Sequence, residues 1–93
     1  VIVTPNFMSV APPIDRDLNE SLNYPDPVGA IGNACGLPAI ALPAGSGRGG
    51  LPLGFQIVAA PWNEPLLLDL GEAFQKRTSH HLARPSLGEA VAH

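Results

Sequence analysis

Short apolar runs separated by glycine and proline restrict the fold of this chain more than any other feature. Residues 39–42 are wholly apolar, which is typical of a strand covered on both faces. A second strand is predicted over residues 53–59, where Gly54 indicates a bulge or a close backbone approach. Only the glycine-rich residues 45–50 separate the two runs, too few for a crossover helix. The sequence therefore predicts an antiparallel β-hairpin over residues 39–59.

A short helix is predicted over residues 26–35, just before the hairpin. Asp26 is a good N-cap because its carboxylate can accept hydrogen bonds from the free N–H groups of the first turn. Pro27 suits the first helical position, and Gly36 is a natural C-cap. Two glycines inside the helix lower its intrinsic stability, so it should form only when packed. Cys35 is accordingly expected to be a small buried residue.

A longer helix is predicted over residues 63–78. Asn63 is the expected N-cap, and Trp62 before it is expected to pack on Leu66 as a hydrophobic staple. Glu72 and Lys76 are spaced to form an i,i+4 ion pair. Apolar residues recur at helical spacing and predict one buried stripe. The stripe consists of Leu66, Leu67, Leu70, Ala73 and Phe74.

The flanking parts carry weaker signals. Residues 1–4 are β-branched and predict a buried strand that ends at Pro5. Residues 5–25 contain a proline pair and a polar cluster, which predict an extended connection. Residues 79–93 are expected to be an exit segment and tail. The sequence begins inside a strand, which favours a truncated or processed chain over a complete one.

Composition indicates one small domain at most, with surface meant to be covered by other protein. Only 14% of the 93 residues are charged, against about 25% in an average soluble domain, although small domains have proportionally more surface. The net charge of −3 and the lack of a basic patch argue against nucleic acid as a partner. The single cysteine fits a reducing, cytoplasmic compartment, and no apolar run is long enough to span a membrane.

The residues that could carry chemistry are few. The Gly45–Gly50 region lacks the Lys-Ser/Thr of a phosphate loop and precedes a strand, so a hairpin turn is the favoured interpretation. Cys35 with His80 or His81 is a weak candidate for a nucleophile and its base. No metal or cofactor site is predicted. A helix cap is a sufficient role for Asp26 on the residues alone.

Three segments together resemble the C-terminal region of the amidase signature family: Asn-Ala-Cys-Gly-Leu-Pro-Ala-Ile at 33–40, Pro-Ala-Gly at 43–45, and Gly-Leu-Pro-Leu-Gly-Phe-Gln-Ile-Val at 50–58. The order of these segments matches the family pattern NxxGxPAxxxPxG, a glycine-bearing loop and GLPxGxQIVG. Further similarity lies at residues 1–5, 11–14, 64–67 and 81–85.

The resemblance implies an α/β fold, with this chain as a helix–β-hairpin–helix fragment of a three-layer α/β/α domain with a mixed sheet. It also implies cleavage of carboxylic amides to acid plus ammonia or amine, or transamidation, by serine, serine and lysine without a cofactor. Those catalytic residues lie N-terminal to this region, and the only lysine here is Lys76 on the last helix. The 93 residues alone are thus expected to be inactive. Their expected partners are the N-terminal remainder of the domain and a small-molecule amide, and the oligomeric state stays open.

Asp26 is the one residue that the resemblance assigns to a substrate pocket. It stands seven residues before Asn33, where glutamine-using members of the family have an acidic residue that holds the substrate ammonium. Pro25 and Pro27 around it depart from that branch. Two alternatives remain open on the sequence: a small binding or adaptor module, and a cysteine hydrolase centred on Cys35.

Overall fold

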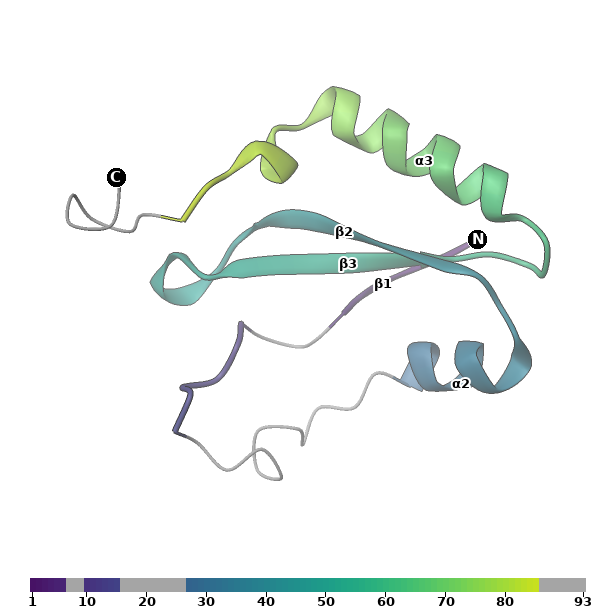
Figure 1. Ribbon diagram of the computed structural model, residues 1–93, viewed down its shortest axis with the longest axis horizontal. Coiled ribbons are helices and arrows are strands. Elements are labelled where there is room, and N and C mark those ends of the chain that lie inside the picture. The colour runs from purple at the N-terminus through teal and green to yellow at the C-terminus, as the bar shows by residue number, and fades with distance from the viewer. Residues whose placement is uncertain (7–9, 16–26, 86–93) are drawn as a thin grey trace.

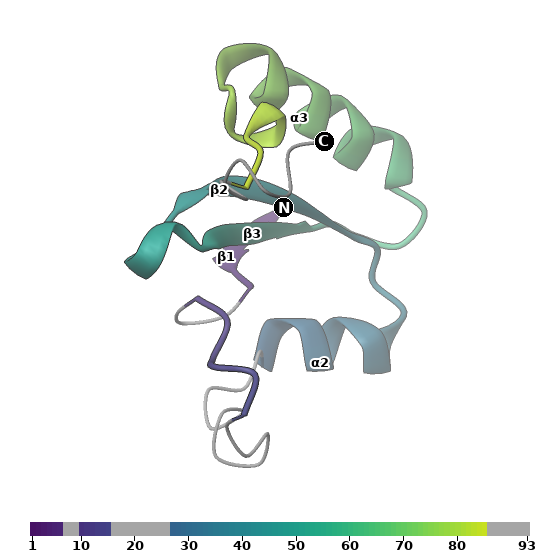
Figure 2. The ribbon, with the colours of Figure 1, turned by 60° about the vertical axis from the view of Figure 1, so that its left-hand side comes forward.

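A three-stranded antiparallel sheet with one helix on each side forms the centre of the computed structural model, which describes residues 1–6, 10–15 and 27–85 (Figures 1 and 2). The strands are β1 (Ile2–Pro5), β2 (Ala39–Ser46) and β3 (Pro52–Val58). The helices are α2 (Pro27–Cys35) and α3 (Glu64–Arg77). Two short 3₁₀ helices, η1 (Arg48–Gly50) and η2 (His80–Leu82), complete the described elements.

Strand β3 is the middle strand of the sheet, with β1 and β2 antiparallel on either side. The β2–β3 pair is the hairpin that the loop without a crossover helix predicted. A bulge lies between Pro43 and Gly45, opposite Gly54 and Leu53. A Cβ at Gly54 would stand 2.7 Å from Asn6 Nδ2 and 3.2 Å from the carbonyl oxygen of Leu42, so the expected close approach is present.

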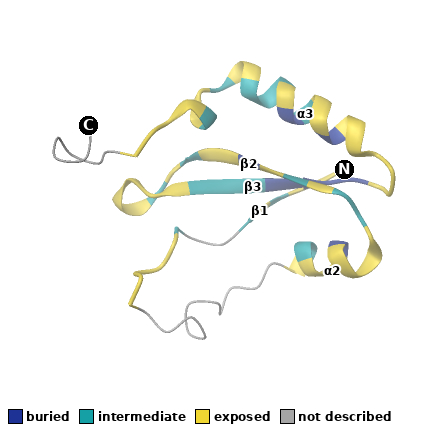
Figure 3. Ribbon diagram, in the orientation of Figure 1, coloured by how far each residue is buried: buried dark blue, intermediate teal, exposed yellow. Residues whose placement is uncertain are grey.

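The main core lies between the sheet and α3. Ile40 and Leu42 of β2 are opposite Ile57 and Phe55 of β3, and opposite residues share a face. Leu67 of α3 belongs to the same buried cluster. The ring of Phe55 meets that of Phe74 edge-on, with centroids 4.9 Å apart and planes at 68°. Figure 3 shows the burial concentrated on β3 and on the side of α3 that faces it.

Helix α2 lies on the opposite side of the sheet from α3 (Figures 1 and 2). Gly32 is its buried residue, and a Cβ there would stand 4.0 Å from Val58 Cγ1, so the small residue allows the helix to approach the sheet. The helix ends at Gly36, whose φ is +72°. The N–H of Leu37 donates to the carbonyl oxygen of Gly32 at 2.8 Å, which is the bond of a Schellman motif. Gly36 thus ends the helix as the sequence predicted.

Several expectations about burial were wrong. Residues 1–4 were expected to be a buried strand, but Val1, Ile2 and Val3 are 68%, 55% and 61% exposed, because β1 has only β3 beside it among the described strands. Cys35 is exposed rather than buried, because the sheet covers only the side of α2 that carries Gly32. Trp62 is 89% exposed with φ of +68°, which leaves the staple unformed.

The strand pairings also limit what can be said of the layers. All pairings among the described strands are antiparallel, and a helix lies on each side, so an α/β fragment is present. The mixed sheet of the amidase signature fold requires further strands. None of the helices in the described part of the chain is both long enough and apolar enough to cross a bilayer.

Candidate functional site

The residue that the sequence assigns to a substrate pocket, Asp26, lies outside the described residues. Its neighbour in sequence, Pro27, begins α2 on the side of the sheet opposite α3 (Figure 1). This neighbour relation ties the predicted pocket residue to the α2 side of the sheet.

Cys35 and the two histidines are not brought together. Cys35 ends α2, which leads into the start of β2 at Ala39. His80 lies beside the far end of β2, where its ring atoms stand 3.7 Å from a Cβ built at Gly45. The strand between Ala39 and Gly45 is roughly 20 Å long, and α2 and η2 lie on different sides of the sheet (Figure 2). The hypothesis of a Cys35 nucleophile with a histidine base therefore has no support in this geometry.

The glycine-rich connection of the hairpin uses its own backbone donors. The N–H of Gly47 donates to Leu51 O at 2.8 Å, and the N–H of Gly50 donates to Gly47 O at 3.1 Å. Gly49 and Gly50 have φ values of +69° and +74°, which glycine tolerates readily. The segment leads into β3 rather than into a helix N-terminus. It is a closed turn rather than a phosphate cradle.

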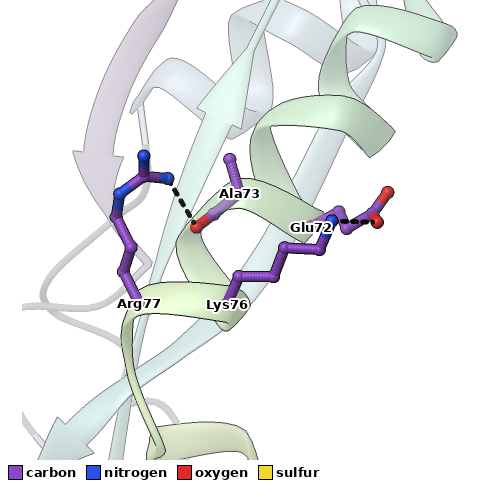
Figure 4. A network of polar contacts seen from close by, with 4 residues as sticks. All are labelled: Glu72, Ala73, Lys76 and Arg77. Carbon is purple, nitrogen blue, oxygen red and sulfur yellow. Dashed lines mark hydrogen bonds and ion pairs between the residues drawn. The ribbon is translucent and has the colours of Figure 1, made fainter.

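A groove of about 420 Å³ lies where α3, β2 and η2 meet. Its floor is apolar, because Ile40 and Leu42 of β2 contribute to it. Glu72 and Lys76 of α3 also line it, and they form the expected i,i+4 ion pair at 2.9 Å on the exposed side of the helix (Figure 4). The remaining lining residues are Leu68, Gly71, Gln75 and His81.

The chemistry available in this groove is limited. His81 offers one buried imidazole nitrogen, Nδ1, that has no hydrogen-bond partner within the described structure. The described lining includes no serine, threonine or cysteine that this nitrogen could activate. Arg77, next to the ion pair, points its guanidinium back to the carbonyl oxygen of Ala73 at 3.3 Å (Figure 4). The groove can therefore accommodate an apolar group or another protein segment, but it holds no nucleophile and base.

The opposite face of the sheet carries two buried polar side chains that sequence reasoning missed. Thr4 of β1 and Gln56 of β3 are opposite each other in register. Gln56 is 6% exposed, and Thr4 Oγ1 is buried without a hydrogen-bond partner among the described residues. Val58 near α2 alternates with Ile57 on the α3 side, so Gln56 and Thr4 lie on the α2 face. The signal was a polar residue two positions before an inward-facing Val58 in an apolar strand.

No cluster for a metal ion is found in the described segments, since no three or more His, Cys, Asp or Glu side chains gather there. The candidate site is therefore the α2 face, with Thr4 and Gln56 buried on it and Asp26 next to α2 in sequence.

Comparison with known proteins gives relatives that are all named as the same subunit of glutamyl-tRNA(Gln) amidotransferase. The protein of this name from Psychrobacter cryohalolentis is 36% identical over 90 residues, which cover 96% of this chain and 18% of the relative. That of Chloroflexus aggregans is 37% identical over 92 residues, or 97% of this chain and 19% of the relative. That of Levilactobacillus brevis is 40% identical over 76 residues, or 82% of this chain and 14% of the relative.

The matched region is in the C-terminal part of these relatives. The chain thus spans less than a fifth of the length of each of these three. No family model matches the chain. No solved structure matches it either.

Proposed function

The chain belongs to the amidase signature family, as a homologue of the C-terminal part of its members, and on this premise we propose that it completes the amidase domain of a longer amide-cleaving polypeptide. That polypeptide is called the whole protein below. The observation that carries the proposal is 36% identity over 90 residues, which extends across 96% of the chain. The similarity includes both strands of the hairpin and α3, and it is therefore not confined to one motif.

The catalytic groups in this proposal lie in the N-terminal remainder of the whole protein. They are a serine nucleophile, a second serine and a lysine, as in the family. The serine oxygen attacks the amide carbon, the C–N bond breaks, and the departing amine takes up a proton. Water then hydrolyses the acyl-enzyme and regenerates the serine. Lys76, the only lysine here, is paired with Glu72 on the exposed side of α3 and is not this catalytic lysine.

The segment contributes core packing and part of the substrate pocket. Two features support a pocket on the α2 face: the unpaired hydroxyl oxygen of Thr4 and the buried side chain of Gln56. Buried polar groups usually have hydrogen-bond partners, so an unpaired hydroxyl on this face is available to a ligand or to the missing protein. Asp26 enters the same pocket from the start of α2 and holds a substrate ammonium through charge-assisted hydrogen bonds.

A second candidate reaction is transamidation, which the name of the relatives favours. In that case the ammonia released from the amide passes to an activated acceptor instead of being lost to water. Amide cleavage is the first step in both reactions, and this segment has the same role in each. With a net charge of −3, the segment itself is poorly suited to hold a tRNA, whose contacts would then fall on other parts of the protein.

The proposal is tested by ammonia release from the whole protein with two amides. Glutamine carries the ammonium that Asp26 would hold, whereas propionamide has none. An Asp26→Asn variant should lose about 10- to 100-fold in kcat/KM for glutamine, because hydrogen bonds to charged groups contribute about 1.5–3 kcal/mol. Its kcat/KM for propionamide should not change. An equal loss with both amides would remove Asp26 from the pocket, and no ammonia from any amide would refute the function.

A further inference from the structure

The two outer edges of the sheet differ in a way that concerns the whole protein. In the described part of the chain, β1 and β2 each have one free edge, because both pair only with β3. A free strand edge presents unpaired N–H and C=O groups, and proteins usually block such edges with proline, bulges, charge or covering segments. The edges can therefore be compared residue by residue.

The outer edge of β2 is blocked. Opposite residues of antiparallel strands alternate between hydrogen-bonded and non-hydrogen-bonded pairs. The carbonyl oxygen of Gly54 accepts from the N–H of Asn6 at 3.3 Å, so Gly54 directs its hydrogen bonds to β1. Pro43, opposite Gly54 on β2, therefore has its nitrogen on the outer side, where it can donate no hydrogen bond. The bulge that follows Pro43 interrupts this edge further.

The outer edge of β1 is not blocked over its first residues. The Asn6–Gly54 hydrogen bond sets the alternation, so Thr4 and Ile2 bond to β3. Val3 consequently directs both its N–H and its C=O away from the sheet. Pro5 ends this free edge, because it has no N–H on that side.

The faces of β1 are also unlike those of an edge strand. Ile2 and Val3 lie on opposite faces of the sheet, and both are more than half exposed. Edge strands of soluble proteins usually carry charge or alternate between apolar and polar residues. A β-branched run without alternation is typical of an interior strand that is covered on both faces.

We propose that the outer edge of β1 pairs with a strand from the N-terminal part of the whole protein, so that β1 is an interior strand and β2 remains the edge of the complete sheet. The occupant is part of the same polypeptide because the chain matches the C-terminal part of relatives whose remaining length is several times greater. This inference rests on the proposed function for the existence of that N-terminal part. It adds the surface that receives it, at Val1–Val3.

Hydrogen exchange of single backbone amides in the whole protein tests this directly. Val3 and Ala41 form a matched pair, because both direct their N–H outward from opposite edges of one sheet. After correction for intrinsic rates, Val3 should exchange at least about 1,000-fold more slowly than Ala41. Equal, fast exchange at both residues would overturn the proposal. Protection at Val3 that disappears on dilution to a monomer would assign the edge to a second copy, which also overturns it.

Two proline variants provide a second measurement. Val3→Pro removes the outward donor of β1 without removing a β1–β3 hydrogen bond, and Ala41→Pro does the same on β2. The whole protein should show faster amide exchange throughout β1 in the first variant and native exchange in the second. Ammonia release is assayed in parallel. Amide cleavage without protection at Val3 refutes this inference alone, whereas protection at Val3 without cleavage of any amide refutes the proposed function alone.

Discussion

Three consecutive leucines on α3 allow the packing of this helix to be tested with one repeated substitution. Leu66, Leu67 and Leu68 are 42%, 3% and 65% exposed. Leu→Ala changes helix propensity by the same small amount at each position, so differences between the variants report burial. Leu67 packs in the core with Leu42 and Ile57 between α3 and the sheet.

Leu67→Ala should cost about 2–4 kcal/mol, because it removes a buried side chain and leaves a cavity. Leu68→Ala should cost less than about 0.5 kcal/mol, and Leu66→Ala should fall between the two. The suitable assay is native-state hydrogen exchange of the α3 amides in the whole protein, which measures the local opening of the helix independently of protein size. A cost of 2–4 kcal/mol corresponds to exchange that is roughly 30- to 700-fold faster.

The result that would refute this reasoning is equal acceleration in the Leu67 and Leu68 variants. Equal acceleration would mean that the sheet does not select the face of α3 on which Leu67 lies. A larger effect at Leu68 than at Leu67 would place the core on the other side of the helix.

Other substitutions probe single contacts. Gly36→Ala should cost about 1 kcal/mol from the positive φ alone, since no described atom lies within 4 Å of the new Cβ, and it should accelerate exchange of the Leu37 amide. Gly54→Ala should cost about 1–3 kcal/mol through overpacking on the Leu42 carbonyl and the Asn6 side chain, measured as faster exchange across β3. Glu72→Gln should change the free energy of unfolding by less than about 0.5 kcal/mol, because its ion pair with Lys76 is exposed.

Local sequence signals were sufficient for the main elements of this fold. Gly36 ended a helix and adopted a positive φ, and the short glycine-rich loop produced an antiparallel hairpin. These features depend on backbone preferences of neighbouring residues, which the sequence states directly. The same is true of the Glu72–Lys76 pair, which helical spacing alone positions.

Burial could not be predicted in the same way. Apolar character shows that Val3 and Cys35 are suited to burial, but it does not show which segment covers them. Both are exposed here, because the described elements cover only one side of α2 and leave one edge of β1 free. Trp62 is exposed because its positive φ turns the chain before α3 in a way that a staple motif does not anticipate.

The candidate site depends on long-range register. Thr4 and Gln56 meet only because β1 pairs with β3 in one register, although the two residues are far apart in the chain. A one-residue shift would place them on opposite faces, and no local pattern excludes that shift. Asp26 came from the family resemblance rather than from geometry, and it lies outside the described residues.

The central claim is that these 93 residues complete an amide-cleaving domain whose catalytic groups lie elsewhere. Its most direct test measures ammonia release from glutamine and propionamide by four samples: the whole protein, the N-terminal remainder, the 93-residue segment, and the two parts expressed together. The account predicts cleavage by the whole protein and by the combined parts, and none by either part alone. Cleavage by the 93-residue segment alone, or full activity of the N-terminal remainder without it, would contradict the account.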